Sequence, residues 1–286
     1  MGRVCVRGAL VVAFFSLCAS VHADQARDWM VAAPPGGTRL MLDMILPGEQ
    51  LTLEHREPIY GIANDVAVRA SHLYTLAFLD HRLDVDLRVL FLGIGVGAGY
   101  RNTFRTLQFD PGQPLSLESR RSLDRSGFVE AVNYPWIEGR ASMALPFNDW
   151  LVLLNTWTLR REDRPRRSYD WRYGVVHDGS PVVSDLWLFL KHRDVGAVAP
   201  LLQVLNFDRD GGRHTQVNWG LTYVTRTGIL LRDDIFLFQI LFHTGDQLGG
   251  QDFSDQYGFH LFRAPFNFIV AHRMVFELYA GDAGEE

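Results

Sequence analysis

The hydroxyl and imidazole side chains of this sequence are poorly spaced for acyl-transfer chemistry. A serine hydrolase needs a serine that hydrogen-bonds a histidine, and the histidine needs an orienting polar partner. Ser71 and His72 are adjacent, as are His243 and Thr244, and adjacent side chains of a β-strand point to opposite faces. We therefore predict no catalytic residues and no enzymatic activity, with a lipid hydrolase as the less favoured alternative.

Two acidic stretches could in principle hold a cation. Asp246, Asp252 and Asp255 form one, and the segment Asp208-Arg209-Asp210-Gly211 forms the other. Neither supplies the oxygen ligands of a recognisable calcium loop. Both are predicted to be solvated turns, and we expect no metal and no cofactor.

Arginine is almost the only basic residue of the chain, because Lys191 is its single lysine among 28 basic residues. Guanidinium groups can fork onto phosphates. A crowded arginine segment therefore supplies candidates for binding lipid phosphate, with a solvated loop paired to its own acids as the alternative. These candidates are Arg160, Arg161, Arg164, Arg166 and Arg167.

A second polar set alternates with apolar residues along several segments and carries charges of both signs. In a closed barrel such a set would face the lumen. It would either pair into a plug or line a narrow path for small polar or charged solutes. The lumen-lining candidates are Arg69, Asp84, Asp86, Arg88, Asn218, Gln239, Arg273 and Glu277.

The elements that must position these residues are β-strands, because apolar side chains recur at every second position. Val217, Trp219, Leu221 and Tyr223, for example, alternate with smaller or polar residues. Short turns are predicted at Asp80-His81 and Asn148-Asp149, and long connections at about 102–136 and 161–181. About twelve segments fit strands: 38–46, 51–58, 65–79, 83–100, 137–147, 150–160, 182–191, 197–207, 214–230, 235–245, 256–263 and 267–279.

Four glycines, Gly93, Gly95, Gly97 and Gly99, recur at every second residue of one predicted strand. A nucleotide-binding loop would need a turn and a helix after its strand. We therefore interpret the glycines as a bare stripe on one face of the strand, which permits bending or makes room for large side chains.

The first 23 residues have the pattern of a cleaved secretory signal. Arg3 and Arg7 precede an apolar run, and Val21-His22-Ala23 fits a signal-peptidase site. Both cysteines, Cys5 and Cys18, lie in this segment. We predict a signal peptide at 1–23 and a single domain at 24–286 with a short acidic C-terminal tail.

Composition narrows the classes of partner. The formal net charge of −5 is unlike that of a nucleic-acid-binding domain. No segment after residue 23 reaches the ~18 apolar residues of a transmembrane helix. If the protein lies in a membrane, strands must cross it.

The export signal, the alternating segments and the terminal strand with Phe276, Leu278 and Tyr279 resemble small Gram-negative outer-membrane barrel proteins. The resemblance implies an all-β, antiparallel transmembrane barrel of about 12 strands in the outer membrane. Its partners would be outer-membrane lipid and lipopolysaccharide, periplasmic chaperones and the barrel-assembly machinery. It would serve as a small-solute channel or a structural envelope component. The main alternative is a soluble periplasmic β-barrel or sandwich that binds a small or lipidic ligand.

Overall fold

The computed structural model describes most of the predicted domain as strands and short turns. Among these residues no helix is long and apolar enough to cross a membrane. The described residues are 36–45, 48–59, 64–75, 78–109, 129–164, 167–170, 175–192, 195–209, 211–227, 234–244 and 266–280. The predicted signal peptide and the acidic tail lie outside them.

Twelve long strands form the wall of a barrel, and two short strands, β8 (Arg167–Asp170) and β9 (Val175–His177), pair beside its rim. The wall strands are β1 (Gly37–Ile45), β2 (Gly48–Pro58), β3 (Asn64–Thr75), β4 (Phe78–Val89), β5 (Leu92–Phe109), β6 (Val129–Asn148), β7 (Leu151–Glu162), β10 (Val182–His192), β11 (Gly196–Arg209), β12 (Gly212–Arg226), β13 (Ile235–Thr244) and β14 (Phe266–Ala280).

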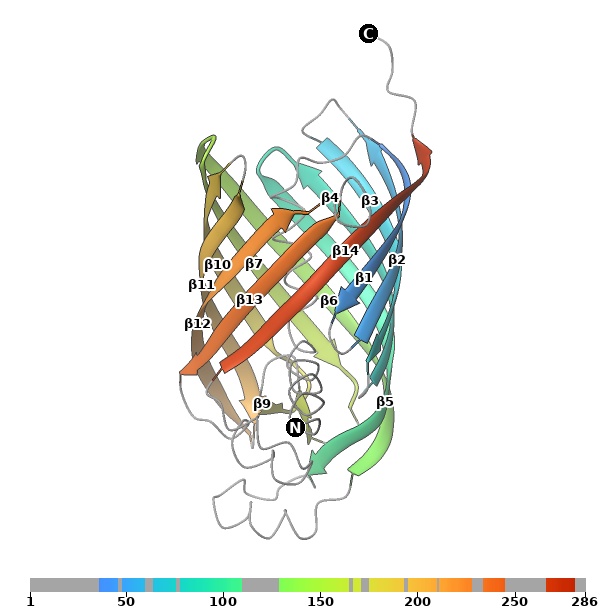
Figure 1. Cartoon of the computed structure of the whole chain (residues 1–286). Helices are drawn as coiled ribbons and strands as arrows, with labels where there is room; N and C mark the ends of the chain where they lie inside the picture. The colour runs from blue at the N-terminus through green and yellow to red at the C-terminus, as the bar shows by residue number, and fades with distance from the viewer. Residues whose placement is uncertain are drawn as a thin grey trace, which may run out of the picture.

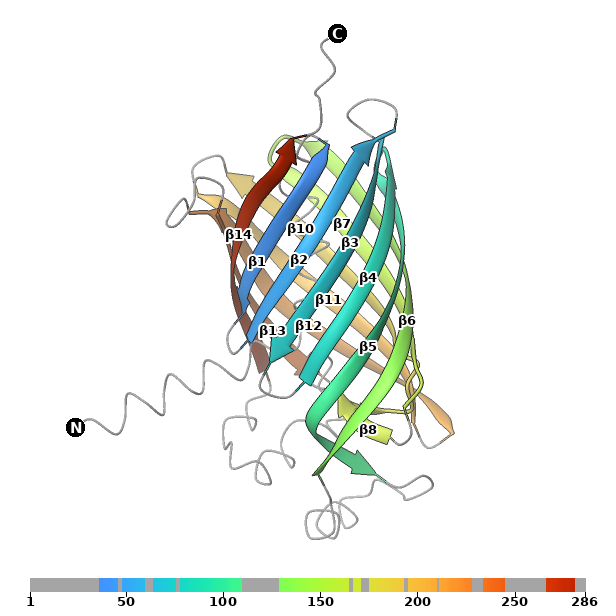
Figure 2. The same cartoon turned by 90° about the vertical axis from the view of Figure 1, so that its right-hand side faces the viewer.

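Each wall strand pairs antiparallel with the wall strands before and after it in the chain, so the topology is a meander. The sheet closes because β14 pairs with β1, in a register that places Ala280 opposite Gly37. Figures 1 and 2 show the resulting tilted, closed cylinder. The predicted antiparallel barrel of about 12 strands is confirmed.

Side chains alternate between the two faces of the wall along each strand. On β2, Leu51 and Leu53 are exposed on the outside, whereas Thr52 and Glu54 are buried on the inside. On β4, Leu83 and Val85 point outward and Asp84 points inward. The wall is therefore apolar outside and largely polar inside.

The two ends of the barrel differ in the length of their connections. We call the end where β1 begins and β14 ends the terminal end; it is uppermost in both figures. Its connections are 59–63, 90–91, 149–150, 193–195 and 227–234. The opposite end, which we call the loop end, carries the three longest connections, at 110–128, 163–181 and 245–265. Outer-membrane barrels place short turns in the periplasm and long loops outside the cell.

Two predicted strands, 65–79 and 83–100, are wrong in their boundaries. The structure divides this region into β3, β4 and β5, and the predicted turn at Asp80-His81 lies within β4. The real turn at Leu90-Phe91 was missed because it contains no glycine, proline, asparagine or aspartate. The predicted strand at 256–263 lies outside the described residues. The predicted connection at 102–136 is shorter than expected, because β5 continues to Phe109 and β6 begins at Val129.

The glycine stripe lies on the inner face of β5, as its interpretation as a bare strand face requires. A Cβ atom at Gly95 would overlap the Asp86 carboxylate, and one at Gly97 would overlap that of Asp84. The stripe therefore leaves room for charged side chains of the neighbouring strands to lie across β5.

Gly99→Ala should destabilise the barrel, because its Cβ would overlap the His81 carbonyl and the Trp136 ring. We expect a loss of roughly 1–3 kcal/mol in the free energy of unfolding, as for overpacked cores. Gly139→Ala is the matched control, because no atom lies within 4 Å of its added Cβ. Urea titration in lipid vesicles, read from the gel mobility of unboiled samples, measures both. Equal midpoints for the two variants would contradict the steric argument.

Candidate functional site: a charged inner wall

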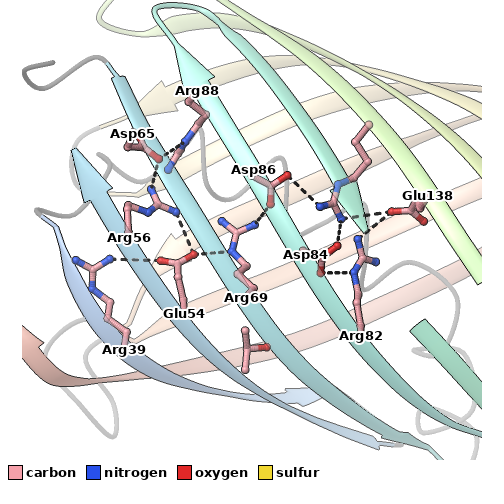
Figure 3. A network of polar contacts seen from close by, with 12 residues as sticks. Arg39, Glu54, Arg56, Asp65, Arg69, Arg82, Asp84, Asp86, Arg88 and Glu138 are labelled. Carbon is pink, nitrogen blue, oxygen red and sulfur yellow. Dashed lines mark hydrogen bonds and ion pairs between the residues drawn. The ribbon is translucent and has the colours of Figure 1, made fainter. Parts of the chain in front are cut away.

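The inner face of β1 to β7 carries a continuous set of arginines and acids, which we call the charged wall (Figure 3). Pairing of these groups is needed because a buried charge without a partner is costly. Its members are Arg39, Glu54, Arg56, Asp65, Arg69, Asp80, Arg82, Asp84, Asp86, Arg88, Arg101, Glu138, Arg140, Arg160 and Glu162.

Glu138 on β6 is the centre of the charged wall. Its carboxylate lies 2.9 Å from Arg82 Nη2 on β4, 3.4 Å from Arg140 Nη1 and 3.5 Å from Arg160 Nη1 on β7. The side chains of Glu138 and Arg160 are both 0% exposed. Three guanidinium groups therefore share one fully buried carboxylate.

Arg140 extends the network back toward β4. Its Nη1 lies 2.8 Å from Asp84 Oδ1 and its Nη2 lies 3.0 Å from Asp86 Oδ1. Arg140 and these two acids stand on strands that flank β5, so their contacts cross the glycine stripe. Figure 3 shows Asp84 and Asp86 with Arg82 and Glu138 in this part of the network.

Arg69 on β3 links the contacts around Glu138 to β1 and β2, which lie near the pairing of β1 with β14 that closes the barrel. Its Nη1 donates to Asp86 over 2.8 Å and its Nε donates to Glu54 over 2.5 Å. Glu54 also accepts from Arg56 at 3.1 Å and lies 3.5 Å from Arg39. The chain of contacts thus runs without a break from β1 to β7.

Aromatic rings support the charged wall near the loop end. The Arg160 guanidinium lies 3.9 Å from the centroid of the Trp136 ring, and that of Arg82 lies 5.2 Å from it. The indole Nε1 of Trp136 donates to Asp80 at 2.8 Å, and Asp80 also accepts from Arg101 at 3.0 Å. Cation–π contacts gain strength where water is excluded, so Trp136 helps to hold two buried cations.

A separate ion pair joins the first and last strands. Arg273 on β14 donates from Nε and Nη2 to the two carboxylate oxygens of Asp43 on β1, at 2.5 and 2.6 Å. Both side chains are buried. This forked pair lies at the seam where the barrel closes.

The inner face of β10 to β13 is different, because amides and apolar residues replace most charges. Asn218 donates to Gln203 over 2.8 Å, and Gln203 donates to Asp185 over 2.8 Å. A buried apolar cluster joins these strands to the inner faces of β6 and β7. It contains Ala144, Val152, Leu154, Trp187, Phe189, Ala197, Ala199, Leu201 and Leu241.

All eight lumen-lining candidates lie on the inner face, and seven of them are buried or half-buried: Arg69, Asp84, Asp86, Arg88, Asn218, Gln239 and Arg273. The eighth, Glu277, lies near the terminal end with its side chain exposed, 4.0 Å from Arg39. Arg69, Asp84 and Asp86 belong to one network, Arg88 contacts Asp65 at 3.2 Å, and Arg273 belongs to the seam pair.

The prediction that the arginine segment binds lipid phosphate is wrong for two of its members. Arg160 lies within β7 and points into the barrel. Arg164 contacts Glu162 and lies 5.2 Å from the Tyr134 ring, with its side chain almost completely buried. Both guanidinium groups are paired with buried carboxylates of the barrel. Arg161 is exposed on the outer face, whereas Arg166 and the side chain of Arg167 lie outside the described part.

Several members of the charged wall, including Arg82, Glu138 and Arg140, are not among the residues predicted to line the lumen. The signal for them was present, because Glu138 and Arg140 alternate with Ile137, Gly139 and Ala141. Arg82 was missed because the misplaced turn at Asp80-His81 left it outside both neighbouring strands.

Ser71 and His72 point to opposite faces of β3, as their adjacency predicts. His72 is exposed on the outside, where its Nδ1 lies 3.0 Å from Nδ1 of His81. A different hydroxyl–imidazole contact joins Thr38 and His55, with 2.9 Å between Oγ1 and Nδ1. Within the described ranges, no group of three or more histidine, cysteine, aspartate or glutamate side chains is arranged to hold a metal ion.

Comparisons with known proteins give no family for this chain. No family model matches it, and no curated protein matches it. Among solved structures, the translocator domain of the autotransporter NalP from Neisseria meningitidis is similar at 10% identity and a TM-score of 0.37, over 90% of this chain and 95% of that one. The outer membrane phospholipase A from Escherichia coli is similar at 10% identity and a TM-score of 0.27, over 87% and 98%. Neither similarity assigns an activity.

Glu138→Ala should destabilise the barrel strongly, because it leaves buried guanidinium groups without their shared carboxylate. We expect a loss of roughly 3–5 kcal/mol in the free energy of unfolding. Glu57→Ala, which removes an exposed carboxylate from the outer face of β2, should cost less than about 1 kcal/mol. Urea titration in vesicles compares the two. Similar midpoints would show that the charged wall is not an energetic unit.

The seam pair should behave as a coupled unit. Arg273→Met alone leaves the buried Asp43 carboxylate without its forked partner and should destabilise the barrel by roughly 3–5 kcal/mol. Combining it with Asp43→Leu should recover most of that loss, because neither charge then remains buried alone. A double-mutant cycle on urea midpoints measures the coupling. Additive losses in the double variant would refute it.

Proposed function

We propose that this protein is an outer-membrane barrel of a Gram-negative bacterium, exported by a cleaved signal at 1–23, that acts as a structural envelope component. Its lumen is closed by its own side chains and does not serve as an open solute channel. The observation that carries the proposal is the burial of the inner charges, with Glu138 and Arg160 at 0% exposure.

The distribution of polarity supports a membrane setting over a soluble periplasmic binder. A soluble barrel or sandwich would turn its apolar faces inward and its charges outward. Here Ile94 is 64% exposed and Val96 is 60% exposed on the outside, while the arginines and acids of the charged wall are inside. Acyl chains solvate such an exterior, whereas water does not.

The state of the inner face supports a closed lumen over an open one. A water-filled channel leaves its lining side chains accessible to solvent. In this barrel the guanidinium and carboxylate groups are turned onto one another, and Leu154, Trp187 and Phe189 are completely buried on the opposite side. A wall of 12 strands is near the size that side chains can still fill.

Membrane insertion would bring further partners. Periplasmic chaperones and the barrel-assembly machinery would deliver the chain, and outer-membrane lipid and lipopolysaccharide would surround it. Arg161 is exposed near the loop end of β7. Of the five predicted phosphate-binding arginines, Arg161 is therefore the one whose described position would allow contact with a lipid phosphate.

Electrical recording separates a closed wall from a channel for small polar solutes. After envelope fractionation, the folded band should shift between unboiled and boiled samples. The purified protein should then give no steady conductance in planar bilayers, and neither Arg273→Ala nor Glu277→Ala should change that result. A porin reconstituted in parallel is the positive control. Discrete wild-type conductance whose size or selectivity changes in Arg273→Ala would overturn the closed-lumen proposal.

A lipid hydrolase is the second candidate, and one contact chain favours it. Thr38 Oγ1 lies 2.9 Å from His55 Nδ1, and His55 Nε2 lies 3.3 Å from Glu57 Oε1 on the outer face. A hydroxyl, an imidazole and a carboxylate in series is an arrangement used in nucleophilic catalysis. Release of fatty acid from phospholipid vesicles, abolished by both Thr38→Val and His55→Ala, would establish this activity in place of a purely structural role.

A further inference from the structure

We propose that one arc of the terminal end is immersed in the acyl chains of the inner leaflet, while the opposite arc lies in water, so that the barrel sits obliquely in the membrane. This inference rests on the proposed membrane location. The immersed arc, which we call the apolar rim, comprises the turns that follow β4, β6 and β10. Its members are Leu90, Phe91, Phe147, Trp150, Leu190 and Val195.

The turn between β4 and β5 is unusual for a turn in water. It reads Val89-Leu90-Phe91-Leu92, and Leu90 has a φ of 53° with 62% of its surface exposed. Tight hairpin turns with positive φ favour asparagine, aspartate or glycine, and leucine there is strained. An apolar surrounding accounts for a leucine where water would favour a polar residue.

The backbone of the apolar rim is adapted to hydrocarbon. The Phe91 carbonyl accepts from the Ala144 N–H at 2.8 Å, and the Trp150 carbonyl accepts from the Lys191 N–H at 2.7 Å. Each turn is thus bonded to the next strand of the wall. In a bilayer core the backbone must satisfy its polar groups within the protein, and these two carbonyls meet that condition.

At the turn between β4 and β5 the apolar rim continues the outer apolar band without a polar border, whereas the exposed His192 lies between Leu190 and Val195 at the turn after β10. On β4 and β5 the outward side chains Leu87, Val89, Leu92 and Ile94 are all exposed and lead directly into the turn. The strands of the other two turns follow as neighbours in the sheet. A surface that docks a protein is usually rimmed by polar residues, so continuity with the band favours lipid as the occupant.

Trp150 marks where the next turn meets the headgroups. It lies beside Asn148 and Asp149, and its backbone N–H donates to the Asn148 side-chain oxygen at 3.0 Å. Tryptophan favours the membrane–water interface. Immersion is therefore deepest at Leu90 and Phe91 and becomes shallower toward β7.

The opposite arc of the terminal end carries polar and charged side chains on its outer face at β1 and β2, beside the exposed Leu278 and Tyr279 of β14. His55 and Glu57 are exposed near the end of β2, with Thr38 beside them on β1. Glu277 is exposed at the rim of β14, but on the inner face opposite Arg39, so the outer carboxylate of this arc is that of Glu57. Carboxylates are unfavourable in hydrocarbon, so this arc lies in water while the apolar rim does not.

Site-directed fluorescence can measure the depth of each arc. The cysteines of the chain are Cys5 and Cys18, so replacing both by alanine leaves a background for single thiols. Leu90→Cys tests the apolar rim, Glu57→Cys tests the polar arc, and Val96→Cys reports the middle of the outer band. Each thiol carries a nitrobenzoxadiazole dye, and the protein is folded into phosphatidylcholine vesicles with nitroxide on the acyl chains. Phe147→Cys replaces Leu90→Cys if the strained turn does not fold.

The three positions give separable outcomes. We expect strong quenching at 90 and 96, several-fold greater than at 57. Weak quenching at 96 would refute the membrane location itself. Strong quenching at 96 with weak quenching at 90 would refute the immersed rim and leave the membrane location standing. Quenching at 90 that appears only when the protein is diluted in lipid would show that a second copy covers the rim, which also overturns the inference.

Discussion

The structure depends on ion pairs that cross β5 from β4 to β6. Arg82 reaches Glu138, and Arg140 reaches Asp84 and Asp86, over the part of β5 whose inward residues are glycines. Side chains on the middle strand would occupy the space that these contacts use. The glycine stripe and the neighbouring acids and arginines therefore depend on one another. The glycines leave the inner face of β5 bare, and the charged side chains of β4 and β6 pair in the space this leaves.

The two halves of the inner face bury their side chains with different kinds of contact. A closed sheet pairs the backbone groups of its wall, so the interior must accommodate only side chains. From β1 to β7 it does so with charges whose pairing offsets their desolvation, and from β10 to β13 with amides and large apolar residues around Trp187. The charged half tolerates little change of register, because each arginine contacts acids on particular strands.

Much of this fold could be predicted from the sequence, because an apolar outer face and paired charges inside impose a period of two. That period identified Asp84, Asp86 and Arg88 as one face, and adjacency alone separated Ser71 from His72. The turn at Leu90-Phe91 could not be recognised, since its residues are those of a strand. Arg160 was assigned to a loop because arginines cluster around it in the sequence, whereas its partners Glu138 and Glu162 and the Trp136 ring are brought together by the folded wall.

Register is the property that the buried charges specify best. Buried ion pairs are weak evidence for stability, because apolar residues of similar volume often do as well. A slip of one residue between two strands, however, moves every side chain of a strand to the other face. In this barrel such a slip on β6 would turn Glu138 and Arg140 to the apolar outer face and bring Ile137 and Ala141 inside. Asp43 and Arg273 impose the same condition where the barrel closes. The charged wall thus makes wrong registers costly, which gives a physical reason for the many arginines on the inner face of this barrel.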